Sequence, residues 1–220
     1  MADRIYIVED HPIVRRGFAS LIEEESDLTV CGETGSVRTA RRHIGDLQPD
    51  LAIIDLFLED GSGLTLIKDL KPTMEASLRA LVISGQPESL YAQRVLAAGA
   101  HGYLMKSEAY WHVVPAIRRV LSGHIYLSEK MTAAILTNYV GTSQSRTRSP
   151  LEMLSDRELE VFTLLGNGLD RREIAEALSV SPKTIDTHQD HLKEKLSLKN
   201  HSQLRRNAAV WVATSGPELE

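Results

Sequence analysis

Short apolar runs that alternate with helix-like stretches constrain this chain more than any other feature. The runs with the clearest apolar character lie at residues 4–8, 51–54, 80–83 and 102–105. Near-continuous apolar strands indicate a parallel sheet that is covered on both faces. With a further strand at 28–34, they predict an α/β fold: a five-stranded, doubly wound parallel sheet.

Helical stretches follow the strands. Pro12 suits the first position of a helix, whereas Gly99 and Gly123 mark helix ends. The predicted helices lie at about 12–25, 36–47, 63–70, 88–98 and 109–122. This alternation gives five strand–helix units in the first half of the chain.

The residues that close the apolar runs carry the chemistry. The first run leads into Glu9 and Asp10, the second into Asp55, the next into Ser84 and the last into Lys106. The carboxyl ends of the strands form the active edge of an open parallel sheet. We therefore expect three acids, one hydroxyl and one lysine to meet there.

Such a set can hold a divalent cation and a phosphoryl group. A carboxylate can accept a phosphoryl group, and phosphoryl transfer depends on positioning and on neutralising negative charge. Mg²⁺ prefers oxygen ligands, which Glu9, Asp10 and Asp55 can supply. Lys106 can pair with a phosphoryl oxygen and Ser84 can donate to another. Each piece alone is typical of a turn or a surface; their order at separate strand ends is the specific signal.

These residues resemble the receiver domain of response regulators over about residues 3–123. The resemblance implies a flavodoxin-like fold and a histidine kinase that phosphorylates Asp55. It implies that Glu9 and Asp10 hold Mg²⁺, and that Ser84, Tyr103 and Lys106 form the switch. The opening from Glu9 to Gly17 is similar to the NarL/FixJ branch.

Three positions near the acids depart from the family pattern or flank it. Glu59 stands where the family often has proline. Phe57 stands where the family offers a backbone carbonyl to the metal. We interpret His11 as a residue at the pocket rim. An alternative is an aspartate-nucleophile phosphatase of the haloacid dehalogenase type, but such enzymes have a second Asp where Phe57 stands.

The last part of the chain is predicted to be helical. Ser155 and Glu158 form a capping box, Asp170 can cap a short helix, and Ser181 precedes Pro182 at the start of a longer one. This order indicates a helix-turn-helix. We predict a smaller all-α domain, in which residues 182–196 form the recognition helix.

This part resembles the LuxR-type DNA-binding domain over about residues 151–213. A helical wheel places polar residues opposite an apolar stripe from Ile185 to Leu192. The predicted DNA-facing residues are Lys183, Thr184, Asp186, Thr187, Asp190 and His191. Two of them are acidic, and residues 151–220 carry nine Lys and Arg against twelve Asp and Glu. Acids can accept from cytosine but repel phosphates.

Composition indicates where the domains meet and to which class of protein the chain belongs. Residues 141–150 are rich in Ser, Thr and Arg and predict a linker. We therefore expect a receiver domain at 1–127, a connector with a short helix at 128–150 and a DNA-binding domain at 151–220. One cysteine, Cys31, and a net charge of −5 suit a cytoplasmic protein. We find no membrane-spanning stretch and no leader.

We therefore predict a DNA-binding transcriptional regulator of a two-component system, controlled by phosphorylation of Asp55. Its expected partners are a histidine kinase, double-stranded DNA and a second copy of the chain; the expected cofactor is Mg²⁺. The acidic recognition helix motivates one alternative, a phospho-dependent adaptor whose helical domain binds protein instead of DNA.

Overall fold

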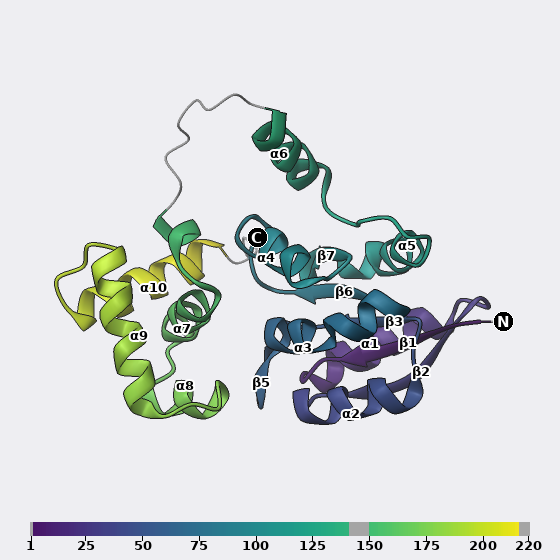
Figure 1. Cartoon of the computed structure of the whole chain (residues 1–220), viewed down its shortest axis with the longest axis horizontal. Coiled ribbons are helices and arrows are strands. Elements are labelled where there is room, and N and C mark those ends of the chain that lie inside the picture. Colours follow the sequence, from purple (N-terminus) through teal and green to yellow (C-terminus); the bar gives the residue numbers. More distant parts are fainter. Residues whose placement is uncertain (1, 141–149, 216–220) are drawn as a thin grey trace. The chain divides into compact units, whose positions relative to one another are not determined.

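The computed structural model describes residues 2–140 and 150–215, without the side chains of 74–76, 138–140 and 215. The chain forms two compact units, residues 1–136 and 137–220. Figure 1 shows strands and helices in the first unit and helices in the second, coloured green to yellow. The predicted combination of an α/β unit and a smaller all-α unit is confirmed.

The first unit alternates strands and helices as predicted. Its main strands are β1 (Asp3–Val8), β2 (Leu28–Thr34), β3 (Leu51–Ile54), β6 (Arg79–Ser84) and β7 (Gly102–Met105). Its helices up to the connector are α1 (Pro12–Glu23), α2 (Val37–Leu47), α3 (Gly63–Ala76), α4 (Glu88–Ala98), the short 3₁₀ turn η1 (Lys106–Glu108) and α5 (Ala109–Leu121).

The five strands form one parallel sheet in the order β2-β1-β3-β6-β7. This is the flavodoxin-like order: β2 lies on one side of β1 and the later strands lie on the other. The switch point of the topology is therefore between β1 and β3. The carboxyl ends of β1 and β3 lie side by side, because Val8 pairs with Ile54. Residues that follow these two strands are therefore neighbours.

Alternate strand residues pack on opposite faces of the sheet. On one face, Ile5, Ile7 and Ile53 form a core with α1 and α5, to which Phe18, Val113 and Ile117 contribute. The α2–α3 and α3–α4 contacts place the other helices together on the opposite face. Burial of both faces explains why the strands are apolar throughout.

A hairpin follows Asp55, where the sequence predicted only a loop. Its strands are β4 (Phe57–Leu58) and β5 (Gly61–Ser62), which pair antiparallel. Asp60, in the turn, accepts hydrogen bonds from the Val37 amide at 2.7 Å and from the Ser36 hydroxyl at 2.6 Å. The hairpin thus fixes the start of α2 and leads directly into α3.

Helix α6 (Glu129–Val140) follows α5 in the chain. It matches the short helix that we predicted in the connector. The predicted linker at 141–150 lies outside the described residues except for Pro150.

The second unit contains η2 (Pro150–Met153), α7 (Asp156–Gly166), α8 (Arg171–Ala177), α9 (Pro182–Lys195) and α10 (His201–Ser215). The three predicted caps are present. Ser155 and Glu158 form a capping box, Asp170 accepts from two amides of α8, and Ser181 accepts from the Thr184 amide. These caps set where α7, α8 and α9 begin.

Candidate functional site

The acidic residues predicted for the sheet edge lie together. One ligand atom each from Glu9, Asp10, His11 and Asp55 can be chosen so that all lie within 4.8 Å of one another. Glu9 is 1% exposed and Asp55 is 4% exposed. The folding of β1 beside β3 has therefore placed two carboxylates in the protein interior, with Asp10 and the exposed His11 at the rim.

Lys106 bridges the two buried carboxylates. Its Nζ lies 2.7 Å from Asp55 Oδ2 and 2.7 Å from Glu9 Oε2. Burial alone lowers the pKa of Lys106, but the carboxylates of Asp55 and Glu9 outweigh that effect and raise the pKa above its usual value. The ammonium is therefore a fixed positive charge beside Asp55.

Asp55 is held in an environment that disfavours its charge. Burial raises the pKa of its carboxyl, and Lys106 opposes this shift. The Leu56 amide donates to Asp55 Oδ1 at 2.7 Å. Amide and ammonium contacts on different oxygens fix the orientation of this carboxylate.

Ser84 and Tyr103 lie next to this carboxylate. Ser84 is 1% exposed, and its hydroxyl lowers the pKa of both Asp55 and Tyr103 against the larger effect of burial. The Tyr103 hydroxyl donates to the Gln86 carbonyl at 2.6 Å. Burial raises the pKa of Tyr103 well above its usual value, so the phenol is a neutral donor. The Ser84 hydroxyl accepts from the Gln86 amide at 3.4 Å, so the hydroxyl and the aromatic residue predicted for the switch bind the same backbone unit.

Two residues outside the predicted set hold the acids in place. Arg15 donates from Nη1 to the Glu9 carbonyl at 2.6 Å and reaches the Asp10 carbonyl at 3.4 Å. Gly63 packs so closely on Asp55 that a Cβ there would lie 1.9 Å from its carbonyl oxygen. The Gly-Ser-Gly run at 61–63 was a signal for such an approach, but only the fold shows what the glycine meets.

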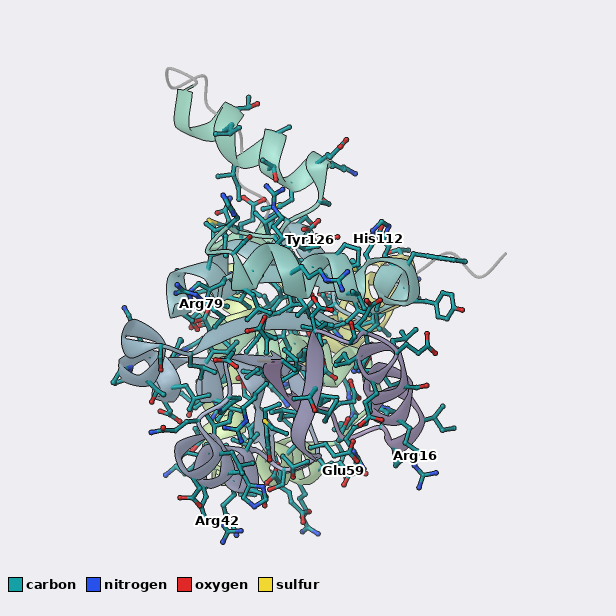
Figure 2. The ribbon with its side chains drawn as sticks, turned by 90° about the vertical axis from the view of Figure 1, so that its right-hand side faces the viewer. Arg16, Arg42, Glu59, Arg79, His112 and Tyr126 are labelled. Carbon is teal, nitrogen blue, oxygen red and sulfur yellow. The ribbon has the colours of Figure 1, made fainter. Side chains whose placement is uncertain are left out.

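The three positions that depart from or flank the motif lie around the site. The Phe57 ring packs edge-on against Tyr91, with ring centroids 6.2 Å apart. Glu59 is exposed (Figure 2). His11 Nδ1 lies 2.8 Å from Asp10 Oδ1 and 3.1 Å from Glu9 Oε1, and the His11 side chain is 69% exposed. His11 therefore sits at the rim, as we interpreted it.

The donor set fits a divalent cation. Three carboxylates face one ammonium, so the cluster carries more negative than positive charge while two of its acids are buried. Isolated buried charges are costly. A hard cation with oxygen ligands would supply the missing positive charge.

In the second unit, α9 presents the residues that the helical wheel selected. Ile185, Gln189 and Leu192 are buried. Of the six predicted DNA-facing residues, four are exposed: Lys183, Thr187, Asp190 and His191. Thr184 and Asp186 are partly exposed; the Thr184 hydroxyl bonds the Ser181 cap at 2.8 Å. The predicted face of α9 is therefore the accessible one.

The acids of this face are paired with bases. Asp186 Oδ2 lies 2.9 Å from Arg171 Nη1, and Asp190 Oδ1 lies 2.9 Å from Lys193 Nζ. Each pair places a positive charge beside an acid, which reduces the repulsion that the sequence predicted between α9 and phosphates. They also occupy two bases that could otherwise contact DNA.

A buried carboxylate connects α9 with α7. Glu158 Oε2 accepts from the Ser155 amide at 2.7 Å and from Lys195 Nζ at 2.6 Å. One side chain thus completes the cap of α7 and binds the last turn of α9. This contact fixes how the recognition helix packs on its own unit.

Two family models match the chain. The response regulator receiver domain matches residues 5–118, and the luxR family of bacterial regulatory proteins matches residues 152–208. The chain belongs to the response-regulator family. Its combination of receiver and LuxR-type domains makes it a NarL/FixJ-type response regulator with a DNA-binding output domain.

Matches to similar proteins cover most of this response regulator and agree with the assignment. The oxygen regulatory protein NreC of Staphylococcus carnosus is 32% identical over 205 residues, which cover 91% of this chain and 94% of that protein. NreC of Staphylococcus aureus strain JH9 is 31% identical over the same share of each chain.

Solved structures show the same architecture. A LuxR-family response regulator from Aurantimonas is 30% identical, with a TM-score of 0.58, and covers 64% of this chain and 100% of that one. A structure of the Salmonella typhimurium response regulator RcsB, described in terms of DNA interaction, is 25% identical with a TM-score of 0.73 and covers 96% and 98%. Within residues 2–140 and 150–215, no helix is long and apolar enough to cross a bilayer.

Proposed function

We propose that this response regulator accepts a phosphoryl group on Asp55 from a histidine kinase and thereby controls its binding to DNA. The observation that carries the proposal is the Lys106 ammonium 2.7 Å from a buried Asp55 carboxylate, within the acidic cluster. The LuxR-type unit supplies the DNA-binding output. NreC is an oxygen regulatory protein and RcsB is a response regulator, and one RcsB structure holds two dimers bound to two parallel DNAs.

The residues of the site divide the transfer among them. An Asp55 oxygen forms a bond to phosphorus while the bond from phosphorus to the histidine nitrogen breaks, which gives an acyl phosphate and a free imidazole. Lys106 pairs with a phosphoryl oxygen, and the Ser84 hydroxyl donates to another. A Mg²⁺ ion held by Glu9, Asp10 and Asp55 would neutralise charge on the phosphoryl oxygens.

We expect Asp10→Ala to weaken Mg²⁺ binding by tenfold or more, because a carboxylate is lost from a set of three. Loss of the Glu9 carboxylate should weaken Mg²⁺ binding less, since Glu9 Oε2 is already in contact with Lys106. The measurement is a calorimetric Mg²⁺ titration of the full chain. Glu59→Ala, an exposed acid outside the cluster (Figure 2), is the matched control. Wild-type affinity in Asp10→Ala would refute the ligand assignment.

The chain divides functionally into a receiver at 1–127, a connector at 128–150 and a DNA-binding domain at 151–220. In the last of these, the groove-facing side chains are those of Lys183, Thr184, Asp186, Thr187, Asp190 and His191. The exposure of this face and the caps that fix α8 and α9 support the assignment. The adaptor alternative loses its main motivation, because both acids of the face are paired with bases.

We expect Asp186→Ala to raise affinity for any duplex and to reduce the preference for the specific one. The substitution removes a repulsive charge and a possible cytosine acceptor, and it releases Arg171 for phosphate contact. Lys183→Ala should weaken specific binding by about 1 kcal/mol or more. Titrations of specific and scrambled duplexes at one salt concentration measure both effects.

The control for Asp186 is Glu176→Ala, which removes an exposed acid from α8 outside the predicted face. The double variant Arg171→Ala/Asp186→Ala should lose the gain in general affinity. An equal gain in the single and double variants would contradict the role assigned to Arg171.

A further inference from the structure

Both switch residues hold the backbone of Gln86. The Tyr103 hydroxyl donates to the Gln86 carbonyl at 2.6 Å, and the Ser84 hydroxyl accepts from the Gln86 amide at 3.4 Å. Gln86 lies in the short loop between β6 and α4. A displacement of either hydroxyl therefore acts directly on the residues that begin α4.

Glu88, the first residue of α4, holds the start of α6. Its Oε1 accepts from the Ser128 amide at 2.9 Å and its Oε2 from the Ser128 hydroxyl. The same hydroxyl accepts from the Met131 amide at 3.1 Å, which makes Ser128 the N-cap of α6. One carboxylate thus orders the cap from which α6 begins.

The segment before α6 is attached to the strand that carries Tyr103. The Tyr103 amide donates to the Tyr126 carbonyl at 2.8 Å, and the Tyr126 amide donates to the His101 carbonyl at 3.0 Å. Tyr126, labelled in Figure 2, therefore extends the edge of the sheet beside β7. This backbone pairing fixes the chain up to Tyr126, so that the Glu88–Ser128 contact is the next attachment along it.

We propose that the Glu88–Ser128 contact is the point at which phosphorylation of Asp55 is transmitted out of the receiver. The inference rests on the proposed function. When the Ser84 hydroxyl turns to the phosphoryl group, Gln86 loses its contact and the loop from 85 to 87 shifts. Glu88 moves with the loop and releases Ser128, and the first turn of α6 opens.

Release of Ser128 would affect the connection to the DNA-binding unit, because of where α6 lies in the chain. α6 is the last helix before the segment that leads to the DNA-binding unit. The first amides of a helix have no partners within it, so loss of the cap leaves them to solvent and frays the first turn. The amides of Ser128 and Met131 report this opening directly.

The test is hydrogen exchange of the full chain at residues 126–133, with and without acetyl phosphate and Mg²⁺. In the wild type, exchange at Ser128 and Met131 should rise roughly tenfold on phosphorylation, since hydrogen bonds to a charged group are lost. Without the donor, exchange should be fast at Ser128 and Met131 in Glu88→Ala and at Met131 in Ser128→Ala. Both variants should gain little exchange with the donor and accept the phosphoryl group normally. Phosphorylation should change the affinity of these two variants for a selected duplex less than it changes the affinity of the wild type.

Ser89→Ala, which removes an exposed hydroxyl next to Glu88, should behave as the wild type. A labelled wild type whose exchange at Ser128 does not change would overturn the inference and leave the proposed function intact. Unchanged exchange at Met131 in unphosphorylated Ser128→Ala, a variant that leaves α4 untouched, would also overturn it. Failure of the wild type to take up the label would overturn the proposed function and the inference together.

Discussion

Asp55→Asn should abolish phosphorylation of this response regulator. The wild type should gain the mass of one phosphoryl group on incubation with acetyl phosphate and Mg²⁺, and the variant none. The physical reason is the position of Asp55, a buried carboxylate fixed by the Leu56 amide and by Lys106. An amide in its place cannot form the acyl phosphate.

Removal of Mg²⁺ with EDTA should suppress labelling of the wild type as well. Asp46→Asn, which changes an exposed acid on α2, should label fully. If Asp55→Asn took up as much label as the wild type, the acceptor would be another residue. The acidic cluster would then need a different function.

Gly63→Ala should destabilise the first unit by about 3 kcal/mol or more, a magnitude typical of severe steric conflict in a core. The added Cβ would lie 1.9 Å from the Asp55 carbonyl oxygen and 3.0 Å from the Leu56 Cα. Backbone cannot yield as a flexible side chain can, so the hairpin and Asp55 must shift. Urea unfolding and the extent of labelling should both report the change.

Gly45→Ala is the matched control. Gly45 lies within α2, and a Cβ there would meet nothing within 4 Å. Alanine favours a helix over glycine, so this variant should be equal or more stable by up to about 1 kcal/mol. Equal stability of Gly63→Ala and the wild type would show that Asp55 is not held by this contact.

Much of the site could be predicted from the sequence, because a parallel sheet brings the carboxyl ends of its strands to one edge. Once β1, β3, β6 and β7 were recognised as apolar runs, the meeting of Asp10, Asp55, Ser84 and Lys106 followed from topology. The caps of α7, α8 and α9 were predictable for a different reason. A cap joins residues two or three positions apart, so its partners are visible in the chain itself.

The contacts that join distant segments could not be predicted in this way. Arg171 and Asp186 lie on different helices, and Glu88 and Ser128 are forty residues apart. Their pairing depends on packing angles and helix ends that single positions do not reveal. For the same reason the α9 acids appeared to be unpaired repulsive charges, although the structure shows them in ion pairs.

Selection of duplexes from a random pool tests whether phosphorylation of Asp55 controls sequence-specific binding to DNA. The full chain is incubated with the pool in the presence and absence of acetyl phosphate and Mg²⁺, with Asp55→Asn in parallel. We expect phosphorylated wild type to enrich duplexes with two paired half-sites, and Asp55→Asn to give the same result with and without the donor. If fully labelled wild type enriched no duplex over scrambled DNA, the output domain would not read sequence. If enrichment were identical with and without the label, phosphorylation of Asp55 would not control DNA binding.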